Sequence, residues 1–210
     1  MENKKEFKET LSIKNMREFI YFSSKAHTSG NFNDLMEAGR MDIVCHTLIA
    51  AFFFSHNIRQ DVKLHLIFAG PPDPCKHLIF EYNKDIPISK KDVAGLIKRM
   101  LYKYKPGKLA EVFPGCKIEK KAFQTLIKEL ESENKKIYLL DEKGEDIRQL
   151  EYDGLKDGVF IIGDHEGLKK GELKFIKSRK EIKKISVGPL TLFASQTMVI
   201  LNNELDRREV

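Results

Sequence analysis

The chain has 210 residues, of which 41% are hydrophobic and 32% are charged. This composition supports one folded domain with a buried core and excludes a disordered chain. No hydrophobic run approaches the roughly 20 residues that span a bilayer, so a membrane-spanning helix is excluded as well. Lysine and arginine total 37 against 31 acidic residues, and the resulting net charge of +6 permits a polyanionic partner without requiring one.

The first residues and the cysteines both indicate a cytoplasmic protein. Residues 1–16 form a polar leader, rich in lysine and glutamate, which lacks the apolar stretch of a signal peptide. The three cysteines, Cys45, Cys75 and Cys116, are odd in number and widely spaced, which suits neither a disulfide framework nor a zinc site. We therefore expect a leader at 1–16, a single domain at 17–210 and no metal.

The first third of the chain alternates between extended and helical patterns. Residues 17–22 read as a strand that ends at the polar segment 23–33. The dense apolar pattern at 42–56 predicts a helix. A period-two pattern predicts the next strand at 62–68. The three prolines within 70–74 then require a loop, because proline cannot donate to a strand ladder.

The middle of the chain predicts one strand and two amphipathic helices. Residues 77–82 resume the extended pattern, and Ser89 and Asp92 have the spacing of a capping box. Behind that box, six residues fall on one helical face: Val93, Leu96, Ile97, Met100, Leu101 and Tyr104. A second helix has its apolar face at Phe123, Leu126, Ile127 and Leu130.

The last third of the chain alternates strands with helices. Strands are predicted at 136–140, 159–162 and 184–187, with a short helix at 171–177 and a last helix from about 191 to 205. Near-continuous apolar strands separated by helices indicate a parallel sheet that is covered on both faces. The predicted fold class is therefore α/β, with a parallel-type sheet flanked by helices.

Three of these late strands run into loops that could bind a ligand, because ligands of parallel α/β sheets bind at the carboxyl ends of strands. The loops begin at Asp141, Gly163 and Gly188. Glycine at a strand end lets a ligand approach the backbone, although a tight turn explains each glycine by itself more simply. Neither glycine loop has the fingerprint of a dinucleotide site or a P-loop.

The run Asp164-His165-Glu166 is the densest cluster of titratable residues in the chain. Proton transfer is one interpretation of this cluster, and a solvated loop with a helix-capping acid is an equal one. A serine hydrolase is disfavoured, because no G-x-S-x-G motif exists and Ser186 has no base near it in the sequence. The six histidines show no helical pair with the spacing of metal ligands.

Several segments in a fixed order carry a resemblance to a known family. They are VFIIGDHEG at 159–167, ISVGPL at 185–190 and NELD at 203–206, together with the upstream segments 17–19, 39–42, 53–61, 114–115 and 144–146. These segments resemble the SPOUT methyltransferases, and within that class the archaeal tRNA pseudouridine-N1 methyltransferases of the TrmY family. The resemblance covers residues 17–210.

The resemblance implies a C-terminal trefoil knot that binds S-adenosylmethionine (SAM), in a homodimer that methylates N1 of pseudouridine 54 of tRNA. By position, three strand-end loops and the last helix would form the cofactor pocket, with free backbone groups that read an adenine edge. The implied cofactor-binding residues are Leu140, Gly163, Val187, Gly188, Pro189, Leu190, Thr191, Leu192 and Thr197. Apolar residues of the last helix favour a homodimer: Leu192, Met198, Val199, Leu201 and Leu205.

The resemblance also implies residues for catalysis and RNA binding. Arg40 and Asp42 match the family's Arg-x-Asp. Asp42 would accept the N1 proton or orient the base, and Arg40 would hold a phosphate or a uracil carbonyl. The alternative for Asp42 is an acid that interacts with the dipole of its helix. The implied phosphate contacts, for which a solvated amphipathic face is an equal alternative, are Arg59, Lys117, Lys120 and Lys121.

The chain departs from the family pattern in two groups of positions. Where the family usually has histidine and cysteine, in the last loop and helix, this chain has Phe193, Gln196 and Thr197. Where the family usually has aspartate or arginine, this chain has Asn57, Gln60, Lys120 and Lys121. Because lysine and arginine are not equivalent at phosphates, two alternatives stay open beside tRNA methylation. These are a non-catalytic or re-targeted RNA-binding paralogue and a pseudouridine methyltransferase of ribosomal RNA.

Overall fold

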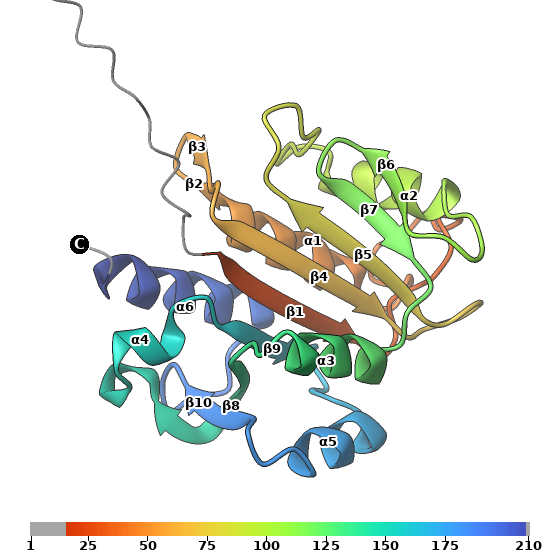
Figure 1. Ribbon diagram of the computed structural model, residues 1–210. Coiled ribbons are helices and arrows are strands. Elements are labelled where there is room, and N and C mark those ends of the chain that lie inside the picture. Colours follow the sequence, from red (N-terminus) through yellow and green to blue (C-terminus); the bar gives the residue numbers. More distant parts are fainter. Residues whose placement is uncertain (1–15, 209–210) are drawn as a thin grey trace, which may run out of the picture.

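The computed structural model describes residues 16–208, so the predicted polar leader lies almost wholly outside the described residues. An eight-stranded sheet runs through the molecule, with helices on both of its faces (Figure 1). The strands are β1 (Arg17–Ser23), β2 (Phe53–Phe54), β3 (Asn57–Ile58), β4 (Val62–Phe68), β5 (Lys76–Glu81), β6 (Ala110–Phe113), β7 (Cys116–Glu119), β8 (Ile137–Asp146), β9 (Val159–Gly163) and β10 (Lys183–Ser186). The helices are α1 (Met41–Phe52), α2 (Val93–Tyr102), α3 (Phe123–Ser132), the 3-10 turn η1 (Ile147–Gln149), α4 (Tyr152–Leu155), α5 (Lys170–Lys177) and α6 (Ala194–Arg208).

The order of strands in the large sheet is β10-β8-β9-β1-β4-β5-β7-β6. The five strands from β10 to β4 pair in parallel, as the sequence predicts. β5, β7 and β6 extend the sheet with antiparallel pairs. The loop between β4 and β5 is too short for the crossover of a dozen or more residues that a parallel pair needs.

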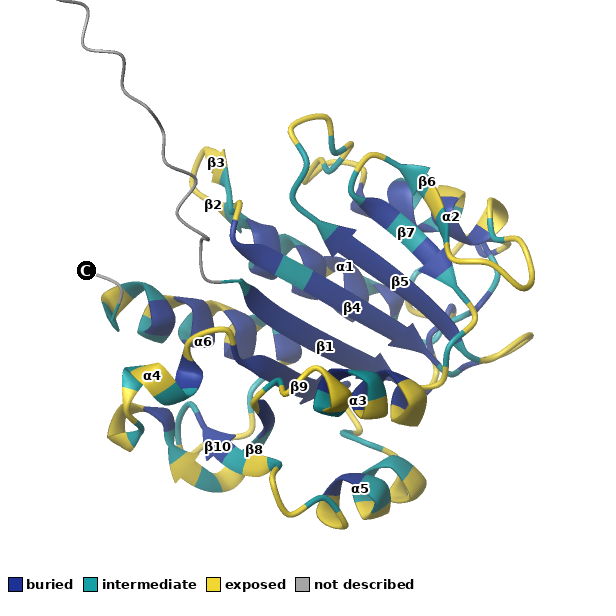
Figure 2. Ribbon diagram, in the orientation of Figure 1, coloured by how far each residue is buried: buried dark blue, intermediate teal, exposed yellow. Residues whose placement is uncertain are grey.

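Two hydrophobic clusters hold this sheet between its helices. Phe19 and Tyr21 of β1 face a cluster that includes α1, α2 and α6. Ile20 and Phe22 point the other way, into a cluster with α3 and α5. This alternation is the period-two pattern of a strand that is buried on both faces, as the dark blue of β1 in Figure 2 shows. No helix within residues 16–208 is both long and apolar enough to cross a membrane.

The structure corrects several predicted boundaries. The first helix ends at Phe52 rather than at 56, because the next residues form the β2–β3 hairpin. The capping box is wrong: α2 begins at Val93, and the Ser89 hydroxyl accepts a hydrogen bond from the amide of Lys91 instead. The strand expected at 136–140 continues as β8 to Asp146, so Asp141 lies within the strand and not at the start of a loop. The last helix begins at Ala194, three residues later than expected. The β6–β7 hairpin and α4 have no counterpart among the predicted elements.

Candidate active site

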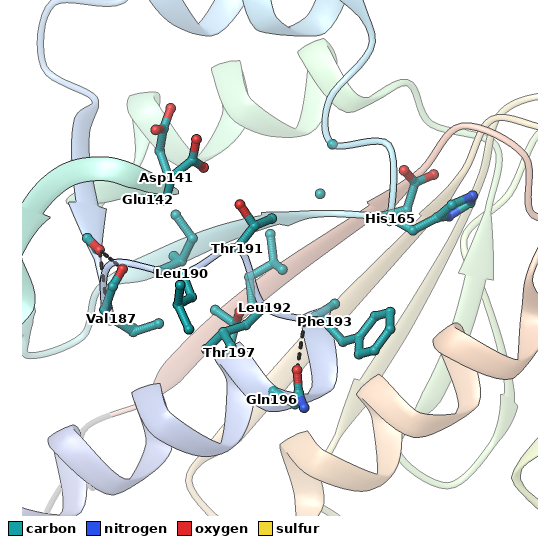
Figure 3. Close-up of a pocket in the computed structure, with 18 of the residues that line it drawn as sticks. Asp141, Glu142, His165, Val187, Leu190, Thr191, Leu192, Phe193, Gln196 and Thr197 are labelled. Atoms are coloured by element: carbon teal, nitrogen blue, oxygen red, sulfur yellow. Dashed lines mark hydrogen bonds between the residues drawn. The ribbon is translucent and has the colours of Figure 1, made fainter.

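A pocket of about 510 Å³ opens at the carboxyl ends of β9 and β10 and beside the middle of β8, at residues 140–142 (Figure 3). Eight of the nine residues predicted to bind the cofactor line this pocket: Leu140, Gly163, Val187, Gly188, Leu190, Thr191, Leu192 and Thr197. Pro189 belongs to the same loop but is exposed and does not line the pocket. The sequence prediction therefore identified segments that the fold does bring together.

The loop after β9 is held by the carboxylate of Asp164. This carboxylate is buried and accepts hydrogen bonds from the amide of Ser24 at 2.8 Å, the hydroxyl of Ser23 at 3.2 Å and the amide of Glu166 at 2.8 Å. Both of its oxygens are thus occupied in fixing the loop to the end of β1. This arrangement favours a structural role for Asp164 over proton transfer.

The loop after β10 presents free backbone groups to the pocket. The hydroxyl of Ser186 donates to the carbonyl of Gly188 at 2.6 Å and accepts from its amide at 3.1 Å, which fixes the start of the loop. The next amides, of Leu190, Thr191 and Leu192, donate to no acceptor among residues 16–208. A ligand in the pocket could accept hydrogen bonds from them, because each is a strong donor without a partner in the described residues.

Titratable side chains lie at both ends of the pocket. Figure 3 shows Asp141 and Glu142 at one end and His165 at the other. Although burial opposes its charge, a hydrogen bond from Lys184 lowers the pKa of Asp141. Asp141 therefore stays ionised, in an ion pair with Lys184 at the edge of the pocket.

These features fit SAM. The volume lies within the range of small-molecule pockets, and apolar side chains such as Ile162 and Val187 can pack against an adenosine. The free amides of the β10 loop can read the edge of the base. The carboxylates of Asp141 and Glu142 complement a ligand that carries a sulfonium and an ammonium group. The residues present thus suit the cofactor that the sequence predicts.

The predicted catalytic pair lies beside this pocket rather than in its lining. Arg40 has a left-handed backbone, with φ of 63°, and immediately precedes α1. Its guanidinium donates to both oxygens of Asp42, at 3.0 and 2.9 Å. This bond is the main cause of the lowered pKa of Asp42. The next residue, Ile43, lines the pocket. Burial and the negative charges of Asp164 and Asp42 raise the pKa of Tyr21, so both carboxylates lie near this tyrosine.

Three of the four predicted phosphate contacts are already paired with acids. Arg59 forms a double hydrogen bond with Asp206, at 2.8 and 2.6 Å, which ties the end of α6 to the loop before β4. Lys120 pairs with Asp73, and Lys121 pairs with Glu119 and Glu129. Within residues 16–208, Lys117 has no ion pair. A role in RNA binding stays a prediction for all four.

The pocket also contains residues that the sequence analysis did not name as cofactor-binding. Gln196, noted only as a departure from the family pattern, accepts a hydrogen bond from the amide of Phe193 at 3.0 Å, just before α6 (Figure 3). Ile43 comes from α1, far away in the chain, and carries no local signal of a site. Glu142 could have been found, because it lies two residues after the predicted end of a strand, where a ligand-binding loop was expected.

Comparison with known proteins identifies the family of this chain. The model of the SAM-dependent RNA methyltransferase family matches residues 16–210. The chain belongs to this family. It is 38% identical to the tRNA (pseudouridine(54)-N(1))-methyltransferase of Methanococcoides burtonii, over 91% of this chain and 96% of the relative. It is 33% identical to the protein of the same name from Methanocaldococcus jannaschii, over 93% of this chain and 98% of the relative.

A solved structure confirms the fold class of this SAM-dependent RNA methyltransferase. Archaeoglobus fulgidus Nep1 bound to S-adenosylhomocysteine matches with a TM-score of 0.65, over 93% of this chain and 99% of that chain, at 13% identity. At this identity the match shows the fold alone. The α/β class, the SPOUT-type architecture and the predicted family are thereby confirmed. The trefoil knot stays a prediction.

Proposed function

We propose that this chain transfers the methyl group of SAM to N1 of pseudouridine 54 in tRNA. The observation that carries the proposal is the pocket at the ends of β9 and β10 and the middle of β8, where eight residues meet that the family resemblance implies for the cofactor. Full-length relatives at 33–38% identity bear the name of this activity. A single domain at 17–210 would carry it, and the three free cysteines suit the cytoplasm.

The geometry supports the following division of labour. SAM supplies an already activated methyl group, so the protein has to align the nucleophile and neutralise the proton that leaves N1. Residues 140–142 of β8 and the loops after β9 and β10 would bind the cofactor. The pair of Arg40 and Asp42, at the start of α1, would bind and orient the base, with the ionised carboxylate of Asp42 directed by two hydrogen bonds from the guanidinium.

Nucleoside analysis by mass spectrometry tests the function. The protein is incubated with SAM and, in separate reactions, with tRNA that carries pseudouridine at position 54, the same tRNA with uridine there, and ribosomal RNA. We expect N1-methylpseudouridine from the first substrate alone. Methylation confined to ribosomal RNA would support the alternative target, and no methylation of any RNA would support a non-catalytic paralogue.

The same proposal includes a homodimer, on different grounds from those the sequence suggested. Met198, Leu201 and Leu205 were expected to face a partner, but all three are buried within the chain, where α6 packs against α1. The large apolar side chains that stay exposed here are Phe193, which directly precedes α6, and Val199 of α6, at 59% and 56%. Phe193 also lines the pocket, so a partner that covers it would contribute to the site.

A charge at Val199 is expected to dissociate the dimer. Val199→Glu places a carboxylate in the proposed interface, where its desolvation opposes association. At micromolar concentration, sedimentation velocity should show a dimer for the wild type and a 24.3 kDa monomer for the variant. Tyr102→Glu, at an exposed aromatic residue of α2, is the control and should stay dimeric. A monomeric wild type would contradict the proposal.

A further inference from the structure

The positive charge of the chain is concentrated in one segment. Residues 168–184 contain eight lysines and arginines and two glutamates, so this segment has a net charge of +6, which equals that of the whole chain. The remaining residues are therefore balanced in charge. The cations are Lys169, Lys170, Lys174, Lys177, Arg179, Lys180, Lys183 and Lys184. Such a local excess is the electrostatic footprint expected for a polyanionic partner.

The segment crosses one face of the sheet, from the methyl-transfer pocket to a second cavity. Lys169 and Lys170 directly follow the loop that lines the pocket, and α5 then spans about 12 Å. Beyond α5, Arg179, Lys180 and Lys183 line a second cavity of about 700 Å³. Two further lysines, which directly precede β8, line that cavity too: Lys135 and Lys136. Figure 1 shows α5 at the end of the molecule opposite to β6.

The helix presents its lysines to solvent. Leu173 and Ile176 pack into the hydrophobic cluster beneath the sheet, whereas Lys170, Lys174 and Lys177 recur on the exposed side of α5. Figure 2 shows this outer side largely in yellow. Apolar and cationic residues thus occupy different faces, as in an amphipathic helix.

These lysines differ from the phosphate contacts that the sequence predicted. Lys120 and Lys121 are engaged by acids, but Lys170, Lys174 and Lys177 form no ion pair with any residue of the described part. The two members of the segment that are paired are Arg179, with Glu131 at 3.8 Å, and Lys184, with Asp141. Unpaired ammonium groups can bind phosphate without first losing an intramolecular partner.

We infer that residues 168–184 form a phosphate-binding track that holds the RNA backbone of the substrate away from the methylated base. This inference rests on the proposed function for the identity of the RNA. The track begins at the rim of the methyl-transfer pocket, so one RNA molecule can occupy both. Its contacts are with phosphates, which position the RNA and read no sequence.

The test compares two triple variants with the same loss of charge. The first combines Lys170→Ala, Lys174→Ala and Lys177→Ala, which leaves the helix intact because alanine is the best helix former. The matched control combines Lys84→Ala, Lys105→Ala and Lys108→Ala, three exposed lysines without an ion pair in the described residues, outside the segment. Binding of an unmethylated tRNA transcript is measured by filter binding at a series of salt concentrations, and calorimetry with S-adenosylhomocysteine checks the fold.

The track predicts a specific loss. The slope of log K against log salt concentration should fall by about two for the α5 variant, since each phosphate contact contributes roughly 0.7 to 0.9. At low salt its tRNA affinity should fall about tenfold or more. The control should bind like the wild type, and all three proteins should bind S-adenosylhomocysteine equally.

Three results would overturn the track. They are equal losses in both triple variants, an unchanged α5 variant, and a wild type that does not bind tRNA. Because this assay measures binding, it is independent of methyl transfer. A wild type that binds tRNA through α5 but methylates no RNA would refute the proposed function and leave the track standing. Methylation of tRNA by the wild type, together with unchanged tRNA binding by the α5 variant, would support the proposed function and refute the track.

Discussion

Asp42→Asn is expected to slow methyl transfer by roughly two to four powers of ten, the usual contribution of one group that handles a proton. The substitution keeps the size of the side chain and removes the charge that the Arg40 guanidinium holds through two hydrogen bonds. Single-turnover rates at saturating SAM and tRNA measure the effect. Affinities for S-adenosylhomocysteine and tRNA should change little.

The control for this experiment is Glu37→Gln. Glu37 lies on the exposed loop just before α1, so the variant makes the same change of charge nearby and should keep the wild-type rate. A wild-type rate in Asp42→Asn would mean that the carboxylate only stabilises the start of α1 through the helix dipole. Asp164 is a weak replacement, because its oxygens already accept three hydrogen bonds.

The pH dependence of the rate gives a second measure of the same role. The hydrogen bond from Arg40 lowers the pKa of Asp42, so the carboxylate is ionised throughout the range above its ordinary pKa of 3.8. The measurement covers about pH 5 to 8, where proteins are usually most stable. Within this range, protonation of Asp42 should not reduce the single-turnover rate. Arg40→Gln lacks the cation, so the decrease in rate at low pH should begin at a higher pH than in the wild type.

Gly163→Ala is expected to weaken SAM binding, with methyl transfer at limiting SAM reduced by about 100-fold, the usual cost of a displacement of 1 Å in a site. A Cβ at this position would meet the backbone of Gly167 at 2.7 Å and that of Leu168 at 3.1 Å. Both atoms belong to the loop that lines the pocket. The loop would have to move, because backbone cannot rotate away as a flexible side chain can.

Calorimetry with S-adenosylhomocysteine and a thermal melt measure this effect. Overpacking of this kind also destabilises a protein by about 1–3 kcal/mol, so the melt shows whether the variant still folds. Gly171→Ala is the matched control: its Cβ would have nothing within 4 Å, and the position lies in α5. Unchanged binding by Gly163→Ala would show that the loop after β9 does not shape the cofactor site.

The sequence alone predicted the fold class and the segments that meet at the pocket, and the family resemblance supplied the individual residues. Near-continuous apolar runs such as 159–162 indicate strands that are buried on both faces, and parallel strands bring their carboxyl ends to one edge of a sheet. The loops after β9 and β10 are therefore neighbours in space although they are distant in the chain. The sequence did not show that β8 continues to Asp146, so that residues 140–142 line the pocket from within a strand.

Only the tertiary structure decided which charges are free. In the sequence, nothing distinguishes Arg59 from the α5 lysines Lys170, Lys174 and Lys177: all are basic residues near predicted helices or strands. In the fold, Asp206 arrives from α6, at the far end of the chain, and engages Arg59, whereas no acid of the described residues reaches the lysines of α5. Ion pairs between distant segments depend on how the helices pack, and no local pattern encodes that. For the same reason Met198 and Leu201 of α6, expected at a partner's surface, are instead buried against α1.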